Sequence, residues 1–164
     1  MNQMGERIYN QWVDDFADGL YRFALKNVRD TDFAKDLVQD AYEKLWIKKD
    51  AIDPMKAKSY LFQIVNNAII DKARKLKIHR DFEGQSIPST MTEQQPFDLH
   101  STLESALLQL PEIQRHVVML RDYEGYSYEE IGEITGLTEH QVKVYIFRAR
   151  QKLRNFLVHP TLIV

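Results

Sequence analysis

The chain has 164 residues, of which 44% are hydrophobic and 28% are charged. This balance is typical of a soluble globular protein, and the length excludes a large multidomain enzyme while allowing one ordinary domain or two small ones. We expect neither export nor membrane insertion, because the sequence has no apolar run of the roughly 18 residues that span a bilayer and no signal peptide pattern at its start. It contains no cysteine, which excludes disulfides and thiolate metal sites and fits a cytoplasmic location.

The net charge of -2 averages over three segments of different character. Residues 1–80 carry 15 Lys and Arg against 12 Asp and Glu, residues 81–100 carry 0 against 4, and residues 101–164 carry 7 against 8. The middle segment also contains Gly84 and Pro88 and has no sustained apolar period. We interpret it as a flexible linker between two small domains.

Apolar residues recur at helical spacing in three long segments of the first domain, 5–28, 32–49 and 56–79. Shorter segments with the same period follow the linker. No segment shows the apolar and polar alternation of a strand over a useful length. The sequence therefore predicts an all-α fold.

After Ser101 with Glu104, two further capping-box patterns occur in the second domain, Ser127 with Glu130 and Thr138 with Gln141. Between them stands Gly136, which suits the left-handed conformation that ends a helix. This order predicts a short helix, a tight turn and a longer helix. A helix-turn-helix has this arrangement, and its second helix enters the major groove of DNA.

The longer helix is predicted to have two contrasting sides. Its core side carries Val142, Ile146, Ala149, Leu153 and Phe156. Its outer side carries His140, Gln141, Val144, Phe147, Arg148 and Gln151, and its flanks carry Lys143, Arg150, Lys152 and Arg154. A solvated surface would explain a basic face by itself, but the capped turn and the amide and basic side chains favour DNA binding.

The second helix of the first domain is predicted to carry an acidic and amide stripe. The stripe consists of Asp36, Gln39, Asp40 and Glu43, and the opposite, buried face of Leu37, Ala41 and Leu45. Spacing alone favours a solvated face. A protein-docking surface is the alternative, because Trp46 lies beside the acidic residues.

The third helix has a different polar stripe and a basic end. The stripe consists of Tyr60, Gln63, Asn67, Asp71 and Arg74, and the basic end adds Lys72, Lys75, Lys77 and Arg80. Such a basic patch can bind phosphates, while an aromatic and an amide side chain can stack on and hydrogen-bond to unpaired bases. Core packing is the alternative for Tyr60 and the favoured interpretation for Phe62.

The order and spacing of three segments resemble those of a bacterial sigma factor of the extracytoplasmic-function (ECF) group. These segments are DLVQDAYEKLW, SYLFQIVNNAIIDKARK and YSYEEIGEITGLTEHQVKVYIFRARQKLR. The resemblance extends over roughly residues 10–156. It implies a region two domain at 1–80, a linker at 81–100 and a region four domain at 101–164. It also implies a protein that binds core RNA polymerase and directs it to promoters.

The resemblance assigns roles to individual residues. Those implied to dock polymerase are Asp36, Leu37, Gln39, Asp40 and Trp46. The minus-10 positions are Tyr60, Asn67, Asp71 and Arg74, together with the basic Lys75. The preceding loop, near Asp53 to Lys58, is expected to help capture a flipped base. The minus-35 positions are Lys143, Val144, Phe147 and Arg148, to which Gln141 and Arg150 are added from the outer face and flank of the helix. His140-Gln141 and Val144-Tyr145 depart from the common family pattern, so the minus-35 preference is not inherited.

The family further implies a monomer when free, an anti-sigma factor as regulatory partner, and association with the nucleoid in the holoenzyme. We expect no cofactor, metal or small-molecule substrate, because the five histidines show no metal-ligand spacing and no nucleotide-binding or hydrolase motif occurs. The alternative function is a dimeric helix-turn-helix regulator that binds a palindromic site alone through residues 112–156.

Overall fold

The structure is a computed structural model that describes residues 3–83 and 99–158. Helices account for almost all of these residues, and the described part of the chain contains no strand. The predicted all-α fold is confirmed. None of the described helices combines the length and the hydropathy that crossing a lipid bilayer requires.

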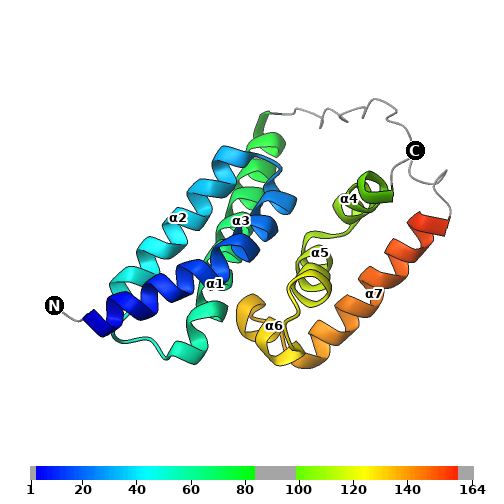
Figure 1. Cartoon of the computed structure of the whole chain (residues 1–164). Helices are drawn as coiled ribbons and strands as arrows, with labels where there is room; N and C mark the ends of the chain where they lie inside the picture. The colour runs from blue at the N-terminus through cyan, green and yellow to red at the C-terminus, as the bar shows by residue number, and fades with distance from the viewer. Residues whose placement is uncertain (1–2, 84–98, 159–164) are drawn as a thin grey trace.

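The first half of the chain forms three long helices, α1 (Gln3–Val28), α2 (Thr31–Lys48) and α3 (Ala57–Glu83). They are the three predicted helices, extended by a few residues at some ends. A short 3-10 turn, η1 (Pro54–Lys56), leads into α3. All three helices pack against one another (Figure 1).

Two aspartates fix the starts of these elements. The carboxylate of Asp30 accepts a hydrogen bond from the backbone N–H of Phe33 at 3.0 Å and caps α2. The carboxylate of Asp53 accepts one from Met55 N–H at 2.9 Å at the start of η1. Each satisfies one of the backbone donors that a helix start leaves unpaired.

The described residues of the second half, 99–158, form four α-helices: α4 (Leu99–Gln109), α5 (Glu112–Val118), α6 (Tyr128–Thr135) and α7 (Glu139–Val158). A π-helical turn, η2 (Met119–Tyr123), continues α5. Helices α6 and α7 form the predicted helix-turn-helix, and α7 lies along the outer side of the second half (Figure 1).

The predicted linker overlaps the ends of two helices. Helix α3 continues to Glu83 and α4 begins at Leu99, so both enter the segment predicted at 81–100. Residues 84–98 lie outside the described part of the chain.

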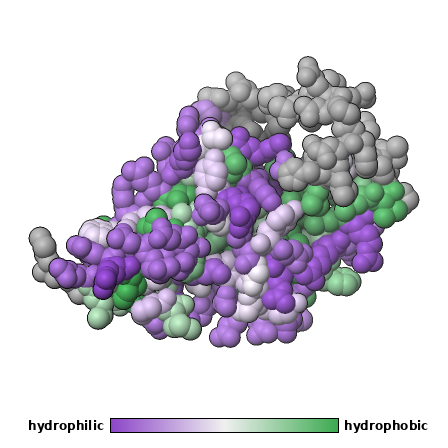
Figure 2. Space-filling view, in the orientation of Figure 1, coloured by the Kyte–Doolittle hydropathy of each residue, from purple (hydrophilic) through white to green (hydrophobic). Residues whose placement is uncertain are grey.

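The two halves pack against each other, and their buried residues form one continuous cluster. Helix α3 contacts α6 along this interface (Figure 1). At its centre the ring of Phe23 lies 5.5 Å from that of His116, and the ring of Phe62 lies 5.1 Å from that of Tyr126, both edge to face. Elsewhere the face shown in Figure 2 is mostly hydrophilic, with hydrophobic side chains in small patches.

Candidate polymerase- and DNA-binding surfaces

The acidic stripe of α2 is exposed and its opposite face is buried, as the helical period predicts. Exposed side chains are those of Asp36, Gln39, Asp40 and Glu43, and buried ones are those of Leu37, Ala41 and Leu45. The stripe therefore offers carboxylates and an amide to a partner along one side of the helix.

Trp46 stands at the end of this stripe and is held in place by two neighbours. The Tyr9 ring meets it edge to face at a centroid distance of 4.8 Å, and Lys49 Nζ lies 3.9 Å from the centroid of the Trp46 ring. The side chain nevertheless remains 41% exposed. A partly exposed aromatic side chain, held in place beside acidic residues, suits a protein interface, where aromatic side chains are enriched.

Leu37 does not belong to this exposed surface. It is only 5% exposed and packs in the core of the first half. Its side chain points away from the acidic stripe, and its implied docking role stays a prediction. Its role is to hold α2 against the other helices.

The polar stripe of α3 is largely exposed, but its members have different surroundings. Asn67 and Lys75 are exposed, and Arg74 pairs with the Asp71 carboxylate at 3.5 Å. Tyr60 is half-buried, with Lys48 Nζ 5.1 Å from its ring centroid. By their helical spacing, five of the predicted minus-10 positions share one side of α3: Tyr60, Asn67, Asp71, Arg74 and Lys75.

Phe62 is 1% exposed, which confirms that it is a core residue. Asn66, next to the predicted Asn67, is fully buried. The basic end of α3 is partly engaged, because Lys72 Nζ lies 3.5 Å from the centroid of the Phe33 ring.

The segment that enters α3 contacts the second half of the chain. Lys58 Nζ lies 4.1 Å from the centroid of the Tyr126 ring, and Lys56 Nζ forms an ion pair of 2.5 Å with Glu133 on α6. No local sequence pattern predicts these pairs, because the partners are about 70 residues apart and lie on different helices. Lys58, a predicted minus-10 residue, is thus held at the interface.

Local contacts build the turn of the helix-turn-helix. Ser127 Oγ accepts a hydrogen bond from Glu130 N–H at 3.1 Å, which confirms the first capping box. Gly136 adopts the left-handed conformation with φ 79° and ends α6. At Gly132 a Cβ would lie 2.8 Å from the carbonyl oxygen of Leu137, so only glycine allows this close approach.

Gln141 forms the second capping box instead of facing outward freely. Its Oε1 accepts from Thr138 N–H at 2.9 Å, and its own N–H donates to Thr138 Oγ1 at 3.2 Å. The side chain thereby fixes the N-terminus of α7. We therefore regard Gln141 as a residue that positions α7.

Arg150 is also engaged within the protein. Its Nε and Nη2 donate to the two carboxylate oxygens of Asp122 at 3.1 Å and 2.5 Å, which ties α7 to η2. This hydrogen bonding raises the pKa of the Arg150 guanidinium. Such a bidentate pair is directional, so it orients α7 relative to η2. The sequence had instead suggested that Arg150 contacts a DNA phosphate.

The outer face of α7 presents the remaining predicted minus-35 residues. Lys143, Phe147 and Arg148 are exposed and Val144 is half-buried. The Lys143 ammonium pairs with Glu139 one turn earlier at 3.0 Å. The inner face is held by three buried residues of the predicted core stripe, Val142, Ile146 and Ala149, while Leu153 and Phe156 are half-buried.

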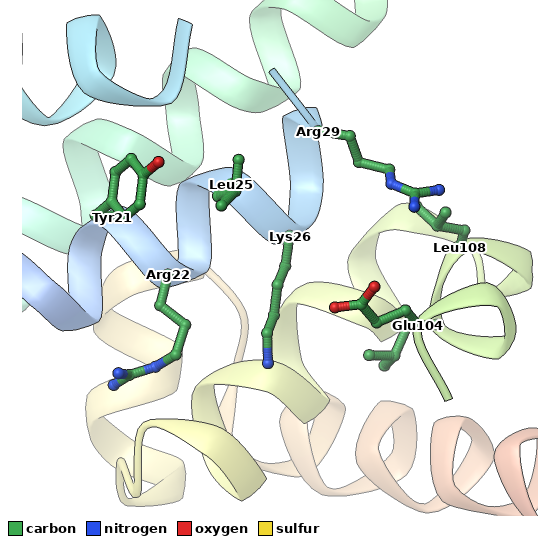
Figure 3. A pocket seen from close by; sticks show the side chains of 8 residues that line it. Tyr21, Arg22, Leu25, Lys26, Arg29, Glu104 and Leu108 are labelled. Atoms are coloured by element: carbon green, nitrogen blue, oxygen red, sulfur yellow. The ribbon is translucent and has the colours of Figure 1, made fainter. Parts of the chain in front are cut away.

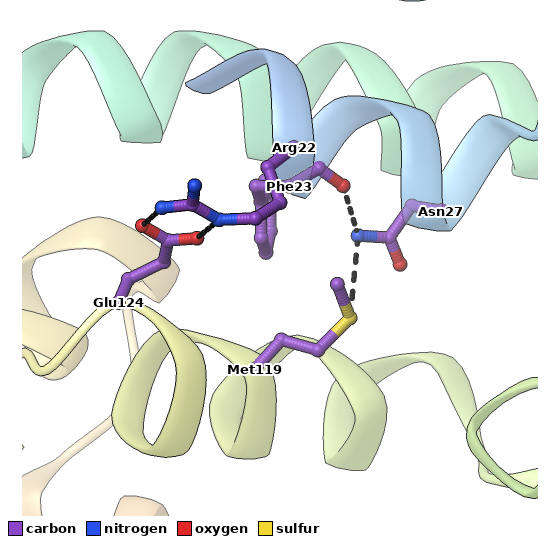
Figure 4. Close-up of polar contacts among 5 residues, drawn as sticks. All are labelled: Arg22, Phe23, Asn27, Met119 and Glu124. Atoms are coloured by element: carbon purple, nitrogen blue, oxygen red, sulfur yellow. Dashed lines mark hydrogen bonds and ion pairs between the residues drawn. The ribbon is translucent and has the colours of Figure 1, made fainter. Parts of the chain in front are cut away.

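Polar contacts also join the two halves of the chain (Figure 4). The Arg22 guanidinium makes two hydrogen bonds of 3.0 Å to the Glu124 carboxylate, which is 8% exposed. Asn27 Nδ2 donates to the Phe23 carbonyl at 2.8 Å and contacts Met119 Sδ at 3.7 Å. These contacts connect α1 with η2 and the turn after it.

A cavity of about 420 Å³ opens beside these contacts, between α1 and α4 (Figure 3). Its lining combines the apolar side chains Leu25, Leu107 and Leu108 with Tyr21, Arg22, Lys26, Arg29 and Glu104. Burial lowers the pKa of Lys26, whose ammonium lies 3.6 Å from the Tyr123 ring centroid.

The arrangement of a three-helix unit followed by a helix-turn-helix unit agrees with two family models. The model of sigma-70 region 2 matches residues 12–78, and the model of sigma-70 region 4 matches residues 100–153. Together they include α2, most of α3, α6 and residues 139–153 of α7. The class of protein is therefore that of the sigma-70 factors.

Individual relatives show which group of sigma-70 factors this chain is similar to. The chain is 29% identical to the ECF RNA polymerase sigma factor SigM of Bacillus subtilis over 91% of this chain and 92% of the relative. It is 30% identical to the ECF RNA polymerase sigma factor SigL of Mycobacterium tuberculosis over 86% of this chain and 84% of the relative.

Two solved structures are also similar. The sigma factor RpoE, crystallised with the anti-sigma factor NepR from Bartonella quintana, has a TM-score of 0.75 at 30% identity, covering 91% of this chain and 96% of that one. CnrH, in complex with the cytosolic domain of CnrY, has a TM-score of 0.68 at 25% identity, covering 93% and 88%. The chain belongs to the ECF group of RNA polymerase sigma factors.

Proposed function

We propose that this sigma factor binds core RNA polymerase through the acidic face of α2 and directs it to promoters that α3 and α7 recognise. The observation that carries the proposal is the presence in one chain of an exposed acidic face beside a restrained Trp46 and a capped recognition helix with an exposed polar and basic face. The units at 1–80 and 101–164 would act as regions two and four, joined by the segment 81–100.

The docking surface we propose consists of Asp36, Gln39, Asp40 and Trp46. Carboxylates attract a basic partner surface, and the half-open indole supplies apolar area at the end of the stripe. Glu43 extends the stripe by one turn and is exposed in the same way. Leu37 supports the surface from the core side.

On the DNA side, we propose that α3 captures unpaired bases of the minus-10 element. Extruding a base costs a few kcal/mol, which stacking and hydrogen bonding must offset. Tyr60 supplies a ring and Asn67 an exposed amide on the same side of α3, with Arg74 and Lys75 available for phosphates. Helix α7 would read the minus-35 element from its exposed face.

Any chemistry then belongs to the polymerase, and the chain itself acts as a non-enzymatic initiation factor in the cytoplasm, monomeric when free and at the nucleoid in the holoenzyme. We further infer that an anti-sigma factor is its regulatory partner. In support, a similar solved sigma factor, RpoE, is bound to an anti-sigma factor. The comparisons with known proteins do not favour the alternative of a stand-alone dimeric helix-turn-helix regulator.

The test is to mix the purified chain with sigma-free core RNA polymerase and follow complex formation by size exclusion and run-off transcription on genomic fragments. A complex that initiates at specific sites supports the proposal. A folded chain that fails to bind its cognate core, or that binds a palindrome tightly without polymerase, contradicts it.

The docking surface is tested by Asp40→Lys, with Asp14→Lys as the matched control, because Asp14 is an exposed acid on a different helix, α1. We expect Asp40→Lys to weaken core binding by at least about tenfold, since reversing a charge within a complementary interface introduces repulsion. Asp14→Lys should leave the affinity nearly unchanged. Equal affinities of both variants would remove the α2 face from the docking surface.

A further inference from the structure

An exposed aromatic ring stands at the centre of the outer face of α7. Phe147 is 68% exposed, more than any other aromatic side chain in the described residues. Its helical neighbour Ile146 is 2% exposed and packs in the core. A phenylalanine left in water at this position has apolar area available for a partner.

The surroundings of this ring are cationic and polar. Lys143 lies one turn earlier, Arg148 follows directly, and Gln151 lies one turn later; all three are exposed. The second apolar member of the face is the half-buried Val144, three residues before Phe147. The face is therefore an apolar spot enclosed by hydrogen-bond donors and positive charge.

The major groove of DNA has the complementary pattern. Phosphates line both edges, and the thymine 5-methyl is the apolar group among the base edges. Val144 and Phe147 are three residues apart on one side of α7, which separates them by about 4.5 Å along the helix axis. Two adjacent methyl groups could thus meet the two side chains.

We infer that Phe147 and Val144 select thymines in neighbouring base pairs of the minus-35 element through their 5-methyl groups. The inference rests on the proposed function and specifies what α7 reads. Neither side chain can donate or accept a hydrogen bond. Discrimination at these base pairs is therefore by apolar contact, while Lys143 and Arg148 contact phosphates or base acceptors beside them.

The experiment uses holoenzyme assembled from the full chain and core RNA polymerase, on a promoter found by the run-off assay. Each minus-35 thymine is replaced in turn by deoxyuridine, which lacks only the methyl group, and the dissociation constant is measured. At one or two adjacent base pairs we expect binding to weaken about fourfold, the equivalent of ~0.8 kcal/mol for one buried methyl-sized group.

Phe147→Ala then identifies the side chain responsible. At one of these base pairs the variant should bind thymine and deoxyuridine DNA equally, while discrimination at the neighbouring base pair persists. Leu157→Ala is the matched control, since Leu157 is a 39% exposed apolar residue near the end of the same helix. It should keep the discrimination of the unmodified protein.

The outcomes separate this inference from the proposed function. If the holoenzyme initiates at promoters but deoxyuridine weakens binding nowhere in the minus-35 element, methyl readout is wrong and the sigma function stands. If Phe147→Ala lowers affinity for core polymerase and leaves the thymine preference intact, the ring contacts polymerase and the inference is also overturned. If no holoenzyme forms, the proposed function fails and the inference fails with it.

Discussion

His116 Nδ1 on α5 lies 2.5 Å from Asn66 Oδ1 on α3, and both residues are fully buried between the two halves of the chain. Because the amide oxygen can only accept, the imidazole donates from Nδ1. His116 Nε2 and Asn66 Nδ2 then have no hydrogen-bond partner. The interface between the two halves therefore buries a polar pair whose hydrogen-bonding capacity is only partly used.

Burial of this imidazole makes stability depend on pH. Desolvation, with a smaller contribution from Arg115, lowers the pKa of His116 from 6.5 to about 3. The Glu112 carboxylate, 3.9 Å from Nε2, therefore faces a neutral ring. Between these two pKa values the unfolded chain binds more protons than the folded one, so the free energy of unfolding falls as the pH falls below 6.5.

We predict that the unfolding free energy is nearly constant above pH 7 and that His116 lowers it by about 1.4 kcal/mol at pH 5.5. Urea titrations at pH 7.5, 6.5 and 5.5 measure this slope. His116→Gln removes the titrating group and should reduce the slope over this range, which lies above the ordinary pKa of carboxylates. The same slope in both proteins would show that His116 is accessible to protons in the folded state.

The His116 and Asn66 side chains should also be energetically coupled. Asn66→Leu leaves the buried imidazole N–H without an acceptor, and we expect a loss of about 1–3 kcal/mol in the free energy of unfolding. His116→Phe alone should cost a similar amount for the stranded amide. The double variant should lose clearly less than the sum, because apolar replacement of both partners removes both unsatisfied groups. Additive losses would mean that the hydrogen bond does not form in solution.

The packing of α3 against α6 has a consequence for promoter binding. Elements centred at minus-10 and minus-35 are separated by roughly 85 Å of B-DNA, at ~3.4 Å per base pair. In the structure, Lys56 in η1, the turn that leads into α3, is ion-paired to Glu133 on α6. The two halves must therefore separate before both proposed DNA-reading helices can bind one promoter.

Because the chain has no cysteine, this separation can be tested directly. We predict that Lys56→Cys and Glu133→Cys, joined by a short bismaleimide, abolish transcription from promoters that need both elements. Each single cysteine variant, treated with the same reagent, should remain active. Normal initiation by the cross-linked protein would show that the halves stay packed in the initiation complex.

Helices and the helix-turn-helix could be predicted from the sequence because their signals are local. Capping boxes and the left-handed Gly136 act within four residues, and apolar periodicity fixes which face is buried. Arg22 and Glu124 are 102 positions apart in the sequence, and His116 and Asn66 are 50 positions apart. No local sequence pattern predicts these two contacts.

The same reasoning applies to two of the candidate site residues. The family resemblance implies a docking role for Leu37, while its helical phase predicts the buried face on which it lies. Arg150 lies on the polar side of α7, but its carboxylate partner comes from η2, which the sequence did not place beside it.

Arg148 and Arg150 therefore allow a direct comparison of reading and positioning within one helix. Arg148 is exposed, whereas Arg150 is bound by both carboxylate oxygens of Asp122. We predict that Arg148→Ala lowers minus-35-dependent transcription by about tenfold, with little change in polymerase affinity or in the free energy of unfolding. Arg150→Ala should instead lower the free energy of unfolding by about 1 kcal/mol, as expected for a partly exposed charge-assisted pair, and Asp122→Ala should reproduce that loss.

If Arg148→Ala and Arg150→Ala reduce the free energy of unfolding equally, the exposed Arg148 is structural. If Asp122→Ala leaves both stability and transcription unchanged, the Asp122 pair does not orient the recognition helix.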